Sequence, residues 1–226
     1  MKLNYVDRRF LAWMVLLLFL LRAGLAGGQP ASAWESIVAG QAIPKQYQSW
    51  SLFLICNPQW YLAESEQKLA TLHEHFRSFG RAIGSSHLAV WFLRSSPTAC
   101  GKFGPDNIDA DRNAAFCQKF KLLPSGSPYV VVTTSYPDLK AEELRREVLI
   151  ELNNLPPGDI GSLLTKLADQ LFAQKLTQAE FDSEQYWSAW RRSLESMREV
   201  VAGFVQRVKL TIDTKVVKLE IEGGAK

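Results

Sequence analysis

Three short runs of large apolar residues alternate with amphipathic stretches, and this alternation constrains the fold of the chain more than any other feature. The apolar runs are residues 51–56, 87–93 and 129–134. Each is flanked by turn-forming residues, as is typical of buried β-strands. Between them, apolar residues recur every three or four positions over residues 64–83. Asp109 or Asp111 is then expected to cap a second helix over residues 112–121. This order predicts an α/β fold in which helices cover a sheet.

The pattern continues beyond the third run. A fourth strand is expected near residues 145–152, and Pro156, Pro157 and Gly158 separate it from a helix that runs from Asp159 to about Gln174. With 226 residues, of which 47% are hydrophobic and 22% are charged, the chain is long enough and apolar enough to form a sizeable core.

The order of elements over about residues 46–174 resembles the thioredoxin-like fold. The resemblance is carried by FLICNPQW at the end of the first strand, by DRNAAFCQKFKLLPSGSPYVVVTT, and by the Ser127–Pro128 step. It implies a three-layer α/β/α domain over residues 46–176. It also implies that Pro128, which opens the third strand, follows a cis peptide bond and faces the active site.

The chain departs from this family at the redox motif. Redox-active members carry Cys-x-x-Cys at the first turn of the helix after the first strand, where the second thiol resolves the mixed disulfide. Here Cys56 is followed by Gln59 at the resolving position, which argues against a dithiol oxidoreductase. We expect Cys56 to be a buried residue at the strand end. The alternative is a monothiol that exchanges disulfides near Pro128.

Two further cysteines, Cys100 and Cys117, lie 17 positions apart. Because an exported protein meets oxidising conditions, a structural disulfide between them is possible, and closing a loop of that size stabilises a protein by roughly 3 kcal/mol. Such a bond leaves Cys56 as the unpaired thiol.

The N-terminal segment predicts export. Residues 1–26 combine basic residues with an apolar run from Phe10 to Leu21 and with small residues after it, which is typical of a signal peptide. The alternative is an uncleaved inner-membrane anchor over residues 10–26. Both place the body of the protein outside the cytoplasm, in the periplasm or an equivalent space. The Gly- and Pro-rich residues 27–45 are interpreted as a linker.

Charge and motifs exclude several functions. Four of the 26 basic residues but only one of the 23 acidic residues lie in residues 1–26, so the rest of the chain is neutral and shows no footprint for nucleic acid. His73 and His75 are two positions apart, cannot chelate one ion from a helix, and are expected on the surface. With no dinucleotide-binding or Walker glycine motif in the sequence, no metal and no cofactor are predicted.

The C-terminal residues 177–226 are interpreted as a long amphipathic helix and a short β extension. Apolar residues step by three and four positions along a heptad seam: Trp187, Trp190, Leu194, Met197, Val201, Phe204 and Val208. A helix of that length is longer than a small domain is wide, so the seam predicts a partner or self-association. The alternating residues 208–213 and 216–223 suggest a strand pair. Alternatively, helix and strands fold back and complete the core.

These observations lead to one hypothesis and two alternatives. The hypothesis is an exported thioredoxin-like protein without dithiol redox activity, which acts as an interaction or structural component of the cell envelope. The first alternative is an enzyme that exchanges thiols and disulfides through Cys56 near Pro128. The second is a groove near Pro128, with Trp60 and Tyr61 beside it, that binds an extended peptide by strand addition.

Overall fold

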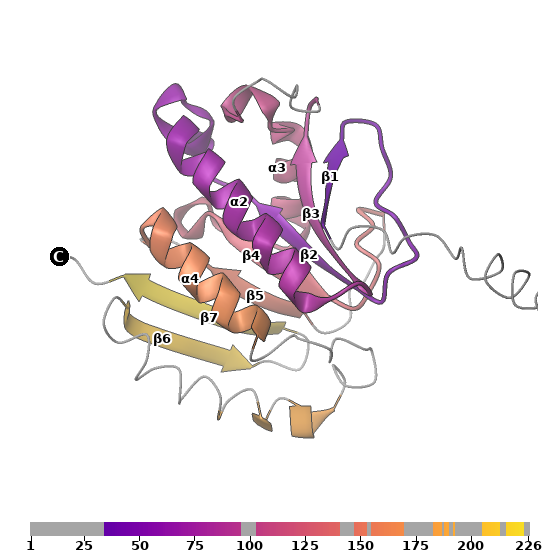
Figure 1. Ribbon diagram of the computed structural model, residues 1–226, viewed down its shortest axis with the longest axis vertical. Helices are drawn as coiled ribbons and strands as arrows, with labels where there is room; N and C mark the ends of the chain where they lie inside the picture. Colours follow the sequence, from indigo (N-terminus) through magenta and orange to yellow (C-terminus); the bar gives the residue numbers. More distant parts are fainter. Residues whose placement is uncertain are drawn as a thin grey trace, which may run out of the picture. The chain divides into compact units, whose positions relative to one another are not determined.

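A seven-stranded mixed sheet organises the chain, in the order β1-β3-β2-β4-β5-β7-β6 (Figure 1). The computed structural model describes residues 34–95, 103–140, 147–152, 155–169, 183–186, 188–189, 192, 205–212 and 216–223. The strands are β1 (Trp34–Val38), β2 (Ser49–Leu54), β3 (His87–Leu93), β4 (Tyr129–Thr133), β5 (Glu147–Glu151), β6 (Val205–Ile212) and β7 (Val216–Gly223). The protein is therefore a mixed α/β structure.

The sheet combines parallel and antiparallel strand pairs. β1, β3 and β2 run parallel to one another, whereas β4 is antiparallel to both β2 and β5. β7 runs parallel to β5, and β6 closes the sheet as the antiparallel partner of β7. Because parallel neighbours need a crossover, the chain between β2 and β3 forms a long helix.

Helices cover both faces of the sheet. The helices are α2 (Glu66–Ile83), α3 (Ala110–Lys119) and α4 (Pro157–Leu167). Short 3₁₀ turns are η1 (Pro58–Tyr61), η2 (Ala63–Ser65), η3 (Pro105–Asn107) and η4 (Pro124–Gly126). α2 and α4 lie side by side on one face, and α3 packs on the other with the chain that precedes β2 (Figure 1).

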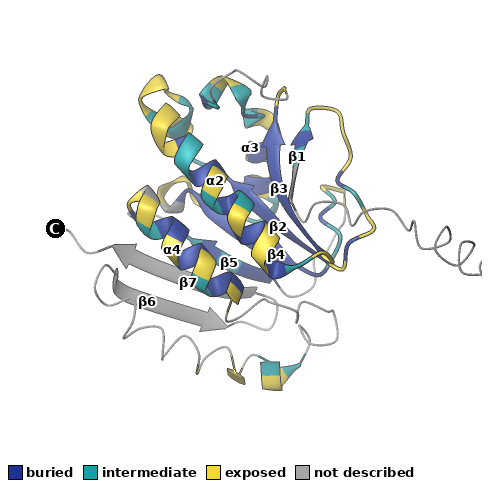
Figure 2. Cartoon of the chain, in the orientation of Figure 1, coloured by how far each residue is buried: buried dark blue, intermediate teal, exposed yellow. Residues whose placement is uncertain are grey.

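The two faces enclose separate apolar clusters, and β2, β3 and β4 between them are buried throughout (Figure 2). Alternate residues of β2 point in opposite directions. Phe53 therefore stacks on Trp91 beneath α2, with ring centroids 4.2 Å apart, while Leu52 and Leu54 join the cluster beneath α3. Under α3, Phe116 stacks on Phe92 at 4.8 Å. Because these strands are buried on both faces, their sequences are nearly continuous runs of apolar residues.

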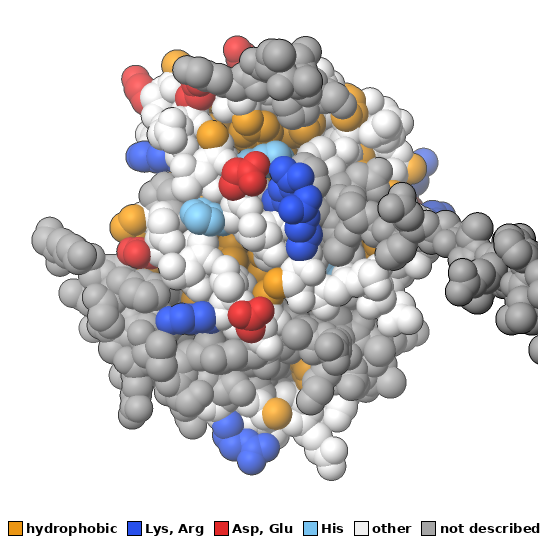
Figure 3. Space-filling view, in the orientation of Figure 1, with side chains coloured by type: hydrophobic (Ala, Val, Ile, Leu, Met, Phe, Trp, Pro, Cys, Tyr) orange, Lys and Arg blue, Asp and Glu red, His pale blue; other side chains and the backbone are white. Residues whose placement is uncertain are grey.

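The contact between α2 and α4 depends on a glycine. A Cβ atom at Gly161 of α4 would overlap the imidazole ring of His75 on α2. On the outer side of α2, Arg77 forms an ion pair with Glu74 at 3.6 Å. Acidic and basic side chains are interspersed over the described part of this face (Figure 3).

Most expected elements are confirmed, with small shifts at their ends. α2, β3 and β4 lie where the apolar patterns predict them, and α3 is capped by Asp109, whose carboxylate accepts a hydrogen bond from the Arg112 amide at 3.0 Å. The linker interpretation of residues 27–45 is wrong at Trp34–Val38, because these residues form β1 and pair with β3. Ile37 is buried in the cluster beneath α3, and this tertiary contact has no local signal in a Gly- and Pro-rich stretch.

The interpretation of the C-terminal residues is partly confirmed. The expected strand pair exists as β6 and β7, and it extends the main sheet instead of standing apart from it. The heptad helix is wrong at Val208, because that residue lies on β6 opposite Ile221. Residues 184–186 are helical, and the aromatic ring of Tyr186 packs on the core beneath α2 and α4. The seam residues Trp187, Trp190, Leu194, Met197, Val201 and Phe204 lie outside the described residues.

The targeting segment also lies outside them, since residues 1–33 are not described. Within the described ranges, none of the helices combines the length and the apolar character that crossing a bilayer requires.

Candidate functional site

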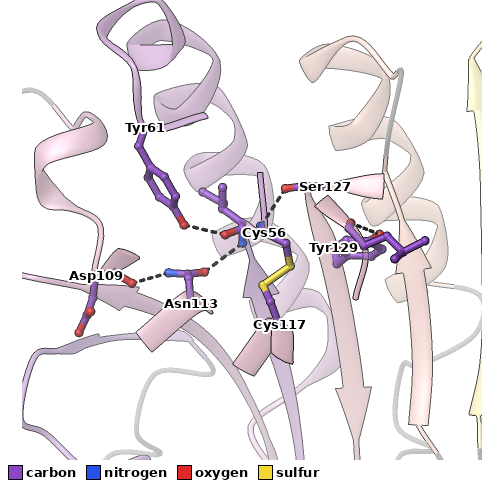
Figure 4. The surroundings of a disulfide bond; sticks show 9 residues. Cys56, Tyr61, Asp109, Asn113, Cys117, Ser127 and Tyr129 are labelled. Carbon is purple, nitrogen blue, oxygen red and sulfur yellow. Dashed lines mark hydrogen bonds between the residues drawn. A yellow bond between two sulfur atoms is a disulfide. The ribbon is translucent and has the colours of Figure 1, made fainter. Parts of the chain in front are cut away.

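The candidate site lies where β2 ends. Asn57 and Pro58 stop the strand, since proline cannot donate to a strand ladder. Three side chains then satisfy the backbone groups of Ile55 and Cys56 in place of a neighbouring strand. These residues arrive from different elements and converge on the two strand-end residues (Figure 4).

All three hydrogen bonds lie within the usual range of lengths. The Ile55 amide donates to Asn113 Oδ1 at 3.0 Å, and the Cys56 amide donates to Ser127 Oγ at 3.0 Å. The Tyr61 hydroxyl donates to the Ile55 carbonyl oxygen at 2.6 Å. Burial raises the pKa of Tyr61, and the nearby charge of Asp109 raises it further, so this phenol stays protonated and remains a donor.

A disulfide bond joins Cys56 to Cys117 of α3, with the two Cα atoms 5.7 Å apart (Figure 4). Asn113 and Cys117 are four positions apart and therefore share one face of α3. That face meets two consecutive residues of the strand end: Asn113 binds the backbone of Ile55, and Cys117 binds the side chain of Cys56. Asn113 is itself held by its Nδ2 atom, which donates to the Asp109 carbonyl at 2.9 Å.

This bond corrects both expectations for the cysteines. The predicted disulfide between Cys100 and Cys117 does not form, because Cys117 is bonded to Cys56. That prediction is therefore wrong. The interpretation of Cys56 as an unpaired thiol is wrong for the same reason. Proximity along the chain favoured Cys100 as the partner, whereas packing of α3 against the end of β2 decides the pairing. Cys100 itself lies outside the described residues.

The two sulfur atoms lie in different surroundings. Cys117 is 6% exposed, whereas Cys56 is half-buried. α2 begins at Glu66, ten residues after Cys56, with η1 and η2 in between. Cys56 is therefore far in sequence from the first turn of the helix, where a dipole would stabilise a thiolate. Cys117 lies in the last turn of α3, where the helix dipole disfavours a negative charge.

The step before β4 completes the site. The Ser127–Pro128 peptide bond is cis, as expected. Ser127 and Pro128 are both buried, and Ser127 contributes its hydroxyl to the Cys56 amide. A peptide cannot add as a strand alongside Tyr129–Thr133, because β4 is already paired with β2 on one side and with β5 on the other.

Two uncharged segments, one that follows β2 and one that precedes β4, form what we call the uncharged rim of the site. The chain leaves β2 and enters β4 at the same end of the sheet, where Leu54 pairs with Tyr129. Residues 55–63 and 122–128 contain no charged residue and no histidine. Leu62 in the first segment is 51% exposed and Leu123 in the second is 65% exposed. Trp60 and Tyr61, expected beside a groove near Pro128, are partly buried and pack against the core beneath α2.

A second polar cluster lies at the opposite end of β2. His87 Nδ1 is 2.8 Å from Ser49 Oγ, and His87 Nε2 is 2.7 Å from Ser51 Oγ. All three residues are buried, and burial lowers the pKa of His87 to about 3. The ring is therefore neutral and bridges the two hydroxyls. Sequence reasoning missed this cluster, although the polar residues alternate within an apolar strand.

The other titratable residues of interest belong to the structure rather than to a site. The surface interpretation of His73 is wrong: its ring is 8% exposed and stacks on Phe103 at 4.2 Å, and burial lowers its pKa to about 4. Burial raises the pKa of Glu147, at the start of β5, to about 7, although Lys119 acts in the opposite direction. Across the described ranges, no group of three or more His, Cys, Asp or Glu side chains could hold a metal ion.

Comparison of the chain with protein-family models, with curated proteins and with solved structures finds no match.

Proposed function

We propose that the chain is an exported protein with a thioredoxin-like domain that has no dithiol redox activity, and that it serves as an interaction or structural component of the cell envelope. The sheet order β1-β3-β2-β4-β5 supports the fold, with β1, β3 and β2 parallel to one another and β4 antiparallel to both β2 and β5. The disulfide supports an oxidising compartment outside the cytoplasm.

One observation carries the functional part of the proposal: the partner of Cys56 is a buried cysteine in the last turn of α3. An incoming thiolate reaches the half-buried sulfur of Cys56 more easily than that of Cys117, and the attack then expels the Cys117 thiolate. A leaving thiol departs faster when its pKa is low. The C-terminal end of a helix and an apolar environment both disfavour a thiolate, so we expect this disulfide to resist exchange.

A disulfide-reduction assay tests this part of the proposal. We expect the full chain to leave the rate at which dithiothreitol reduces insulin unchanged. The matched control is the variant Cys56→Ser/Cys117→Ala, which should give the same rate. Turnover by the wild-type chain that disappears in the variant would overturn the proposal in favour of an oxidoreductase.

The uncharged rim is the surface that we propose for a protein partner. Leu62 and Leu123 expose half or more of their side chains beside a strand end that four bonds hold in place. An apolar segment of an envelope protein matches this rim because neither of its two segments carries a charge that binding would have to desolvate.

Site-specific crosslinking tests the surface in cells. A photoreactive residue at Leu62 or Leu123 should yield one discrete crosslinked species in the envelope, and the same residue at Leu139, which is 43% exposed, should not. Identical crosslinks from all three positions, or none from the first two, would reject the surface.

A further inference from the structure

We propose that the native disulfide is reached by rearrangement from non-native disulfides of Cys100, so that Cys100 is the leaving thiol and the chain is a client for thiol–disulfide exchange where it folds. The inference rests on the proposed function only for the oxidising compartment. The observation behind it is that the bond between Cys56 and Cys117 spans 61 positions and passes over Cys100, the remaining cysteine of the sequence.

Loop lengths determine which pair forms first in the unfolded chain. Cys100 is 17 positions from Cys117 and 44 positions from Cys56. The probability of closing a flexible loop falls with about the 3/2 power of its length. The pair Cys100–Cys117 therefore forms roughly seven times as often as the native pair, and Cys56–Cys100 roughly 1.6 times as often. Only about a tenth of the first disulfides are native on this basis.

The chemistry balances in two steps. A disulfide oxidant such as oxidised glutathione first takes two electrons and two protons from two thiols, which become one disulfide. In the Cys100–Cys117 species, the Cys56 thiolate then attacks Cys117 Sγ. The Cys56–Cys117 bond forms, the Cys100–Cys117 bond breaks, and the electron pair leaves with Cys100 as a thiolate. In the Cys56–Cys100 species, the Cys117 thiolate attacks Cys56 Sγ and again expels Cys100.

The folded structure supplies the reason why both routes end at the same bond. Asn113 holds the backbone of Ile55 against α3, Ser127 binds the Cys56 amide, and the Cα atoms of the two cysteines are 5.7 Å apart. These contacts raise the effective concentration of one thiol at the other. Once the bond has formed, burial of Cys117 protects it from external thiols. Loop length thus governs the first pairing, and tertiary packing governs the last.

Oxidative refolding of the full chain tests the proposal. The reduced chain is equilibrated with oxidised and reduced glutathione, first in denaturant and then after dilution into native buffer. Samples are trapped by alkylation, and the disulfides are assigned by mass spectrometry of unreduced peptides. In denaturant, Cys100–Cys117 should exceed Cys56–Cys117 about sevenfold. After dilution, Cys56–Cys117 should replace it while the Cys100 thiol becomes available for alkylation.

The variants Cys100→Ser and Cys100→Ala are the matched controls, because each leaves a single possible pair. Both should form the native disulfide directly, with no lag. The proposal is overturned if the wild-type chain forms Cys56–Cys117 as fast as the variants do, with no early Cys100 species. It is also overturned if the folded chain retains Cys100 in a disulfide. Neither result bears on insulin reduction, so this experiment and the test of the proposed function fail independently.

Discussion

Removal of the disulfide should cost the protein a large part of its stability. The bond closes a loop with a sequence separation of 61. In the chain-entropy model, cross-linking a loop of that length lowers the entropy of the unfolded state and contributes about 4 kcal/mol to the free energy of unfolding. Since domains are stable by only about 5–15 kcal/mol, this loss should be conspicuous.

Urea unfolding measures the effect. The reference is the Cys100→Ser chain, in which disulfides cannot rearrange, and the comparison adds Cys56→Ser and Cys117→Ala. Serine suits the half-buried position 56, whereas alanine avoids burying a hydroxyl at position 117. We expect the free energy of unfolding to fall by about 4 kcal/mol. A larger slope of that energy against urea should accompany the loss, because the unfolded chain without the bond exposes more surface.

Reduction of the Cys100→Ser chain by a phosphine is an independent route to the same state. It should shift the urea midpoint as far as the two substitutions do. A loss below about 1 kcal/mol by both routes would refute the reasoning. That result would mean that apolar packing and the hydrogen bond between Asn113 and the Ile55 amide hold α3 in place without covalent help.

Three further predictions concern other parts of the protein. Gly161→Ala should destabilise it by about 1–3 kcal/mol in thermal unfolding, because the new methyl group overlaps the His75 ring; an unchanged midpoint would show that the ring moves aside freely. Burial lowers the pKa of His87 to about 3, so its contribution to stability is complete above about pH 6.5 and is lost as the pH falls toward 3. His87→Gln should therefore reduce the slope of stability against pH by about 1.4 kcal/mol per unit between pH 4 and 6, and an unchanged slope contradicts the assignment. Glu147 gives stability the opposite dependence on pH. Its pKa is raised to about 7, so its contribution to stability is complete below about pH 4.5 and is lost as the pH rises through 7. Glu147→Gln should stabilise the protein at pH 8 and have little effect at pH 4, and equal effects at both values would argue against a buried carboxyl.

The parts of the fold that the sequence predicts are those with a local signal. His87–Leu93 is an unbroken apolar run and becomes a central strand, and the spacing of Leu69, Leu72, Phe76 and Phe79 marks the buried face of α2. The resemblance also placed the cis peptide bond correctly at Pro128. In each case the residues that produce the pattern are the residues that are buried.

The features that could not be predicted depend on contacts between distant segments. β1 is only five residues long, so although Trp34, Ile37 and Val38 favour a strand, its order comes from pairing with β3. Val208 fits a heptad as well as it fits an alternating strand, and pairing with β7 decides between them. Spacing along the chain favoured Cys100 as the disulfide partner of Cys117, but the folded structure places Cys56 next to Cys117 instead.

The pairing error also shows what information was present at the site. Asn113 and Cys117 are one helical turn apart, and the sequence alone places them on one face of a helix. What it lacks is the identity of the segment opposite that face. The structure shows that this segment is the end of β2. There Asn113 accepts a hydrogen bond from the Ile55 amide, and Cys117 forms the disulfide bond with Cys56. Two adjacent residues at the strand end, Ile55 and Cys56, are thus held by Asn113 and Cys117, which lie one helical turn apart. That arrangement fixes the base of the uncharged rim, and a rigid base lowers the ordering cost of binding a partner, which is the role that we propose for this surface.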